Sequence, residues 1–148
     1  MPDATRPPLE FAVTLPAPPK QVFAMVLGEP ERWLCRQASV DLRPGGTLRW
    51  CWPDGCAEGR VLLLAEPSNA RFSFRMDGDS LPETMVALSL ATDERYPART
   101  ALTLQHYGFG MGSDWDLLYL GCARAWAGYL KNLRSVIEAG LDLREPNE

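Results

Sequence analysis

The chain has 148 residues, of which 46% are hydrophobic and 23% charged, a composition typical of one soluble domain with a single core. Its 19 acidic and 15 basic residues give a net charge of −4, and Lys and Arg form no basic stripe that would bind a phosphate backbone, so nucleic acid is not an expected partner. The longest apolar run, residues 61–65, is too short to span a membrane, and the first residues lack the features of a secretory signal. We therefore expect a cytoplasmic protein.

The cysteines and the single histidine do not reproduce the spacing of a zinc site, so we expect no metal and no cofactor. In the cytosol the thiols should stay reduced, and Cys35, Cys51 and Cys122 are interpreted as small buried hydrophobic residues. A nucleophilic cysteine paired with His106 would need an orienting group and a lowered thiol pKa, neither of which a sequence can show.

The first third of the chain predicts one strand followed by two short helices. Residues 9–15 alternate between apolar and polar, as a half-buried strand requires. Pro16, Pro18 and Pro19 end this strand, and Pro19 is suited to the first turn of a helix that runs to about Gly28. Pro30 then begins a second helical turn through residues 33–34.

Six further strands follow, separated by turn residues, and are predicted over residues 38–42, 47–52, 58–66, 70–76, 84–92 and 99–106. The segment Pro53-Asp54-Gly55 suits a type I turn with Gly55 in a left-handed bulge position. That turn would pair Trp52 with Cys56, Trp50 with Glu58 and Leu48 with Arg60. The sheet is expected to be antiparallel with seven strands.

From Asp114 the apolar period changes to that of a helix, and this helix is predicted to run from a cap at Ser113 to Gly140. Its apolar face needs a partner, and only the sheet is large enough. We expect one domain over residues 9–140, with frayed tails at residues 1–8 and 141–148 because both are polar and rich in proline or charge.

Five stretches carry a resemblance to a known family: residues 15–23 (LPAPPKQVF), 41–46 (DLRPGG), 58–61 (EGRV), 100–109 (TALTLQHYGF) and 125–133 (AWAGYLKNL). In this order, the chain resembles the START-like superfamily, also called SRPBCC, and within it the homologues of the activator of the heat-shock-protein ATPase. The resemblance implies an α+β helix-grip fold, in which a curved antiparallel sheet of about seven strands wraps around a long C-terminal helix. The implied order is strand, two helices, six strands and helix.

Strand alternation places apolar side chains on the concave face of this sheet, together with three polar residues, Glu58, Arg60 and His106. The predicted site is an apolar pocket between sheet and helix. Its candidate ligand-binding residues are Trp50, Trp52, Glu58, Arg60, Phe74, Met76, His106, Trp115, Tyr119, Cys122 and Trp126.

Each candidate also has a purely structural interpretation. The aromatic residues could fill the core, Glu58 and Arg60 could form an ordinary surface ion pair, and His106 could bond loop backbone near the start of the long helix. The glycine-containing loop at residues 108–112 lacks the lysine of a phosphate loop, and we do not predict a nucleotide site there.

Three functions are compatible with these features, and we favour the first, which is not enzymatic, over the enzyme alternative. The first is non-catalytic binding of a small lipophilic molecule. The second, suggested by the resemblance, is a polyketide cyclase-like or hydrolase-like enzyme that uses Glu58 and His106 as acid and base in one cavity. The third is a chaperone-related or stress-related interaction module, or a homodimer, formed through Val61, Leu63 and Ala65 on the outer face.

Overall fold

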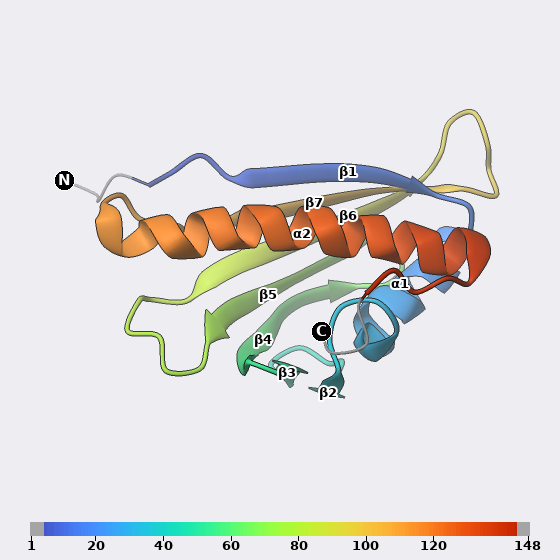
Figure 1. Ribbon diagram of the computed structural model, residues 1–148. Coiled ribbons are helices and arrows are strands. Elements are labelled where there is room, and N and C mark those ends of the chain that lie inside the picture. The colour runs from blue at the N-terminus through green and yellow to red at the C-terminus, as the bar shows by residue number, and fades with distance from the viewer. Residues whose placement is uncertain (1–4, 145–148) are drawn as a thin grey trace.

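The computed structural model describes residues 5–144, which form one antiparallel sheet with a long helix across its face (Figure 1). The elements are β1 (Leu9–Leu15), α1 (Pro19–Gly28), the 3-10 helix η1 (Pro30–Arg32), β2 (Gln37–Val40), β3 (Thr47–Trp52), β4 (Gly55–Ala65), β5 (Asn69–Met76), β6 (Thr84–Thr92), β7 (Thr100–Tyr107) and α2 (Ser113–Ala139). This order confirms the predicted α+β helix-grip fold.

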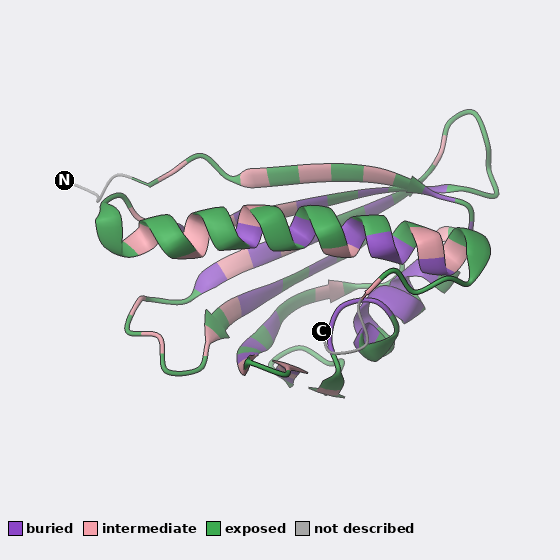
Figure 2. Cartoon of the chain, viewed as in Figure 1, coloured by how far each residue is buried: buried purple, intermediate pink, exposed green. Residues whose placement is uncertain are grey.

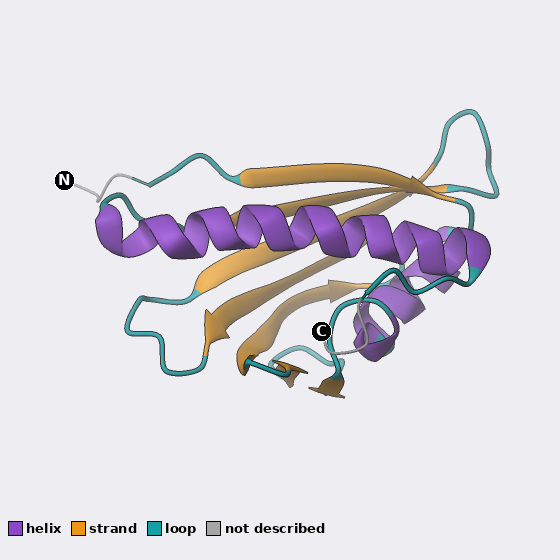
Figure 3. Cartoon of the chain, in the orientation of Figure 1, coloured by secondary structure: helices purple, strands orange, loops and turns teal. Residues whose placement is uncertain are grey.

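The sheet is a single curved layer with the strand order β1-β7-β6-β5-β4-β3-β2, antiparallel throughout. The strands β2 to β7 are sequential neighbours, whereas β1 pairs with β7. The chain therefore passes from one edge of the sheet to the other between β1 and β2, and α1 and η1 make that crossing (Figure 3).

The helix α2 closes the concave side of the sheet. Buried residues lie on the strands behind it and along one side of the helix, while its other side is exposed (Figure 2). Ser113, predicted to be the N-terminal cap of this helix, is its first helical residue, and Gly112 occupies the cap position. Gly140 ends the helix with a φ of 65°, a left-handed conformation that favours glycine. No helix within residues 5–144 is both long and apolar enough to cross a membrane.

The predicted register of the β3–β4 hairpin is wrong by one residue. Pro53 and Asp54 form a two-residue turn, so Trp52 pairs with Gly55, and Trp50 with Ala57. Because strand side chains alternate between faces, this shift reverses the side on which every β4 residue near the turn lies.

The consequence is that small residues face inward where charged residues were expected. Ala57 and Gly59 of β4 are buried on the concave side of the sheet, next to β3. Glu58 and Arg60 are exposed on the convex face. A side chain at position 59 would clash, since an added Cβ would lie 2.0 Å from the carbonyl oxygen of Ser73. Glycine is therefore required there by the close approach of β5.

The register of β4 against β5 shifts between Val61 and Leu63, and this irregularity changes the predicted outer patch. Val61 is buried at 3% exposure, whereas Leu62, expected on the concave face, and Leu63 are 47% and 44% exposed. Val61 therefore does not belong to the outer patch that was predicted to consist of Val61, Leu63 and Ala65.

Within the described part of the chain, each tail has an arginine that contacts the rest of the domain, and the fraying of the ends stays a prediction. Arg6 donates through Nε to the carbonyl of Gly110 at 2.9 Å, and also forms an ion pair with Asp116. Near the other end, Arg144 donates through its guanidinium to the carbonyl oxygens of Cys35 and Glu31, both at 2.8 Å. Residues 1–4 and 145–148 lie outside the described part of the chain.

Asn132 fastens α2 to the segment after it and to the residue after η1. Its side chain is 2% exposed. It donates through Nδ2 to the carbonyl of Trp33 at 3.1 Å and accepts at Oδ1 from the backbone N–H of Leu143 at 2.6 Å. Both ends of the amide are thus used inside the protein.

We predict that Asn132→Ala lowers the free energy of unfolding by about 2 kcal/mol, because it removes two hydrogen bonds and leaves the buried Trp33 carbonyl without its partner. Urea unfolding measures this loss as a lower midpoint with an unchanged slope. The neighbouring exposed Lys131→Ala is the control and should stay within about 0.5 kcal/mol of the parent. Equal losses in the two variants would contradict this role.

Candidate functional site

A cavity of about 690 Å³ lies between the concave sheet and the N-terminal half of α2. This volume is in the range of small-molecule sites. The sheet contributes one wall, α2 the other, and the β3–β4 turn and the residue Leu34 close one side. The lining residues are Leu34, Trp50, Trp52, Pro53, Asp54, Phe72, Phe74, Met76, Leu117, Leu118, Gly121, Cys122, Ala125, Trp126 and Tyr129.

Aromatic rings form much of the cavity wall, and some of their polar atoms are hydrogen-bonded to other protein groups. Trp50 packs against Phe72 and Phe74, with ring centroids 5.3 and 6.0 Å apart. The indole N–H of Trp52 donates to the carbonyl of Leu34 at 2.7 Å. Among the described lining residues, Asp54 is the single one with a formal charge, and it is exposed on the turn. The interior is therefore suited to an uncharged apolar molecule.

Behind this wall, His106 is completely buried and hydrogen-bonded through both ring nitrogens. The indole N–H of Trp126 donates to Nδ1 at 2.9 Å, which makes Nδ1 the acceptor and places the proton on Nε2. Nε2 then donates to Oγ1 of Thr84 at 2.7 Å, and the Thr84 hydroxyl donates to the carbonyl of Phe74. One chain of hydrogen bonds thus joins α2, β7, β6 and β5.

Burial lowers the pKa of His106 from 6.5 to about 3, because the charged imidazolium would lose its hydration. The histidine is therefore neutral near pH 7. Its partners are the side chains of Thr84 and Trp126, so the predicted bond to loop backbone is wrong. His106 positions Trp126, a wall residue, and does not itself line the cavity.

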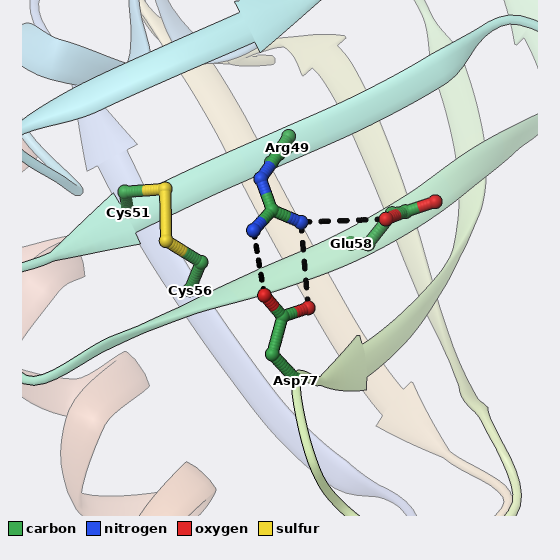
Figure 4. Close-up of a disulfide and its surroundings, with 5 residues drawn as sticks. All are labelled: Arg49, Cys51, Cys56, Glu58 and Asp77. Carbon is green, nitrogen blue, oxygen red and sulfur yellow. Dashed lines mark hydrogen bonds and ion pairs between the residues drawn. A yellow bond between two sulfur atoms is a disulfide. The ribbon is translucent and has the colours of Figure 1, made fainter.

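Glu58 lies on the convex face of the sheet near Arg49 (Figure 4), and Arg60, two residues further along β4, is also exposed on that face. Glu58 pairs with Arg49 at 3.3 Å, not with Arg60, and Arg49 also bonds Asp77 at 2.6 Å. Since an exposed carboxylate on the convex face and a buried neutral histidine share no cavity, the acid–base pair of Glu58 and His106 is wrong.

Two further candidates lie beyond the cavity, at the N-terminal end of α2. Trp115 and Tyr119 both pack edge-on against Phe109, with ring centroids 6.3 and 5.1 Å away. The Tyr119 hydroxyl donates to the carbonyl of Pro7, and the Arg6 guanidinium lies over the Tyr119 ring. Tyr119 therefore anchors the N-terminal segment, Trp115 packs against the loop before α2, and neither residue lines the cavity.

The cavity thus brings together Trp50, Trp52, Phe74, Met76, Cys122 and Trp126 from the predicted set. Several lining residues on α2 were missed: the partly buried Leu118 and Tyr129, and the exposed Leu117, Gly121 and Ala125, which border the buried face of the helix. Their spacing of three and four residues was the available signal. Pro53 and Asp54 were missed because they were treated only as turn residues.

The cysteines divide into two kinds. Cys51 and Cys56, directly opposite on β3 and β4, form a disulfide, so the expectation that Cys51 is a reduced buried thiol is wrong. Cys35 and Cys122 are free and buried, and burial raises the pKa values of their thiols to about 11 and 12. Both stay protonated near neutral pH. Within residues 5–144, no three His, Cys, Asp or Glu side chains are grouped to hold a metal.

We predict that the free energy of unfolding falls by about 2 kcal/mol between pH 7 and pH 5, through His106 alone. The unfolded chain takes up a proton as the pH falls through 6.5, whereas the folded chain does not until about pH 3, so acid favours unfolding. Because the chain has one histidine, urea unfolding of His106→Gln supplies the control. This variant should be less stable at pH 7 and lose most of the dependence over this interval. An equally steep dependence in the variant would contradict the assignment.

Comparison with known proteins agrees with this architecture. The profile of the family described as "Activator of Hsp90 ATPase homolog 1-like protein" matches residues 16–138. No curated protein matches the sequence.

Solved structures with the same fold include CalU16 from Micromonospora echinospora, 22% identical, which gives a TM-score of 0.72 over 94% of this chain and 77% of that one. DynU16, from the dynemicin biosynthetic locus, is 22% identical with a TM-score of 0.76 over 93% of this chain, which spans about half (49%) of DynU16. The Aha1 dimer from Colwellia psychrerythraea is 18% identical, with a TM-score of 0.75 over 91% of this chain and 98% of that one.

At such identities the structures share the fold, and the family profile covers most of the chain. The strand order and the long helix across the concave face agree with both comparisons. The chain therefore belongs to the family of activator of Hsp90 ATPase homolog 1-like proteins, with the helix-grip fold of the START-like superfamily.

Proposed function

We propose that the protein binds a small lipophilic molecule in the cavity between α2 and the sheet. The observation that carries this proposal is a space of about 690 Å³ whose walls are largely apolar and aromatic. An apolar cavity of this size binds an apolar solute by removing the surface of that solute from water.

The wall residues favour a flat and uncharged ligand. Trp50, Trp52 and Trp126 offer ring surfaces, and the indole N–H groups of Trp52 and Trp126 are already bonded to protein acceptors. Opposing aromatic walls gain most from a planar ring system, since offset stacking and edge contacts add to the buried area. A charged group would have to remain at the mouth near Asp54.

Binding without chemistry is the form of this proposal that the site supports. The one acid–base pair suggested by the sequence is separated by the sheet, and the free Cys122 in the wall is held as a thiol by burial. A cytoplasmic location, a homodimer and a chaperone or stress-related partner stay predictions.

We predict that Gly121→Leu weakens binding of the neutral fluorescent probe N-phenyl-1-naphthylamine at least tenfold, about 1.4 kcal/mol, because the new side chain enters the cavity. An added Cβ at Gly121 meets open space, so the fold accommodates it. The affinity is measured by titrating the probe and following its fluorescence.

The matched control is Gly128→Leu, a change on the same helix that also meets open space but lies outside the cavity lining. Replacing a helical glycine should stabilise both variants by about 0.5–1 kcal/mol. Only Gly121→Leu should lose the probe. If the parent binds no probe and native mass spectrometry of gently purified protein shows no small-molecule adduct, the proposed function is wrong.

A further inference from the structure

The Cys51–Cys56 disulfide encloses the turn that forms one side of the cavity. The two cysteines are directly paired on β3 and β4, with Cα atoms 4.1 Å apart. Of the four residues between them, Trp52, Pro53 and Asp54 all line the cavity. A single covalent bond therefore spans the part of the wall that comes from this hairpin.

The sulfur atoms and the cavity lie on opposite faces of the same strands. Arg49 and Cys51 of β3 lie on the convex face together with Cys56 and Glu58 of β4 (Figure 4). Trp50 and Trp52 alternate with them along β3 and line the cavity. Both cysteines are partly exposed. A reductant can therefore reach the bond from solvent without entering the cavity.

The fold does not need this bond. The hairpin register is maintained by the pairs from Thr47–Arg60 to Trp52–Gly55 and by the turn itself. Closing so short a loop removes less conformational entropy from the unfolded chain than a longer loop would, since that entropy grows with the number of enclosed residues. Reduction should therefore leave the sheet intact and act on the turn.

The turn also contacts the other walls of the cavity. The Trp52 indole donates to the carbonyl of Leu34 at 2.7 Å, and its ring lies 6.3 Å from that of Tyr129 on α2. Trp52 thus links the hairpin to α2 and to the segment after η1. Any added freedom of the turn moves a ring that the ligand must contact, and ordering that ring on binding costs affinity.

We propose that the Cys51–Cys56 pair is a thiol–disulfide switch, in which the oxidised form holds the cavity ready for its ligand and the reduced form binds it more weakly. This regulation rests on the proposed function of the cavity. The reductant is a dithiol. One of its thiolates attacks a sulfur of the disulfide to give a mixed disulfide, and its second thiol then displaces the protein sulfur. The protein gains two electrons and two protons as Cys51 and Cys56 become thiols, and the dithiol becomes a disulfide.

The other two cysteines do not compete in this exchange. Cys35 is fully buried and Cys122 is 8% exposed, and burial keeps both protonated at neutral pH. Because the thiolate is the reactive form, neither attacks the disulfide readily. The exchange is therefore confined to the outer face of the hairpin.

The test compares N-phenyl-1-naphthylamine binding by the oxidised protein, by protein reduced with dithiothreitol and freed of it under nitrogen, and by reoxidised protein. Thiol titration confirms each state. We expect the dissociation constant to rise at least fivefold on reduction and to return on reoxidation. Cys51→Ser/Cys56→Ser should bind as weakly as the reduced parent, and dithiothreitol should have no effect on it. This variant controls for the two buried cysteines.

A second readout does not depend on a ligand. The indole N–H signal of Trp52 in a nitrogen–proton correlation spectrum, assigned by its loss in Trp52→Phe, should shift on reduction, while that of Trp126 should not. Unchanged affinity and an unchanged Trp52 signal in protein shown to be reduced would overturn the switch while the cavity still binds. Absence of probe binding in both states would instead overturn the proposed function, and the regulation with it.

Discussion

The register of the β3–β4 hairpin determines what each face of this sheet presents. Its two-residue turn pairs Trp52 with Gly55. This register places Ala57 and Gly59 on the concave side of the sheet and Glu58 on the convex side. A shift of one residue would bring charge into the apolar interior and expel the small residues that give the tryptophans room. Glycine is required at position 59, because an added side chain would clash with the backbone of β5 and would approach the Trp50 ring.

Hydrogen bonds hold two tryptophans of the cavity wall, Trp126 and Trp52, in place. Trp126 is bonded to His106, which is in turn bonded to Thr84, and Trp52 is bonded to the carbonyl of Leu34. Movement of either indole into the cavity would break its hydrogen bond, and for Trp126 that bond is buried, so the loss would leave a buried polar group without a partner. The neutral state of His106 belongs to the same arrangement, since a charged ring could not accept from the Trp126 indole at Nδ1. The polar groups here preserve a shape and are not available for acid–base chemistry.

The sequence predicted the fold well because its periodicities are strong. The alternation in β1 and the helical period of α2 each specify an element and its buried face. The site was predicted less well, because Pro53-Asp54-Gly55 is compatible with two turn lengths that differ by one residue and so place Glu58 on opposite faces. Trp115 and Tyr119 have the right helical face but the wrong end, since α2 extends past the cavity. The partners of His106 come from β6 and α2, and such long-range contacts leave no local pattern in a sequence.

The strand β3 separates two kinds of chemistry by a single residue. Arg49 and Cys51 face solvent, where they form ion pairs and a disulfide, while Trp50 and Trp52 face the cavity. Alternation keeps charges out of the apolar space, yet it also makes every outer residue the covalent neighbour of an inner one. A change of bonding at the outer face therefore reaches the cavity through one peptide unit, with no relay across the domain. In this fold the strands enclose the cavity directly, so the convex surface of the sheet and the cavity wall are one residue apart along the same strand.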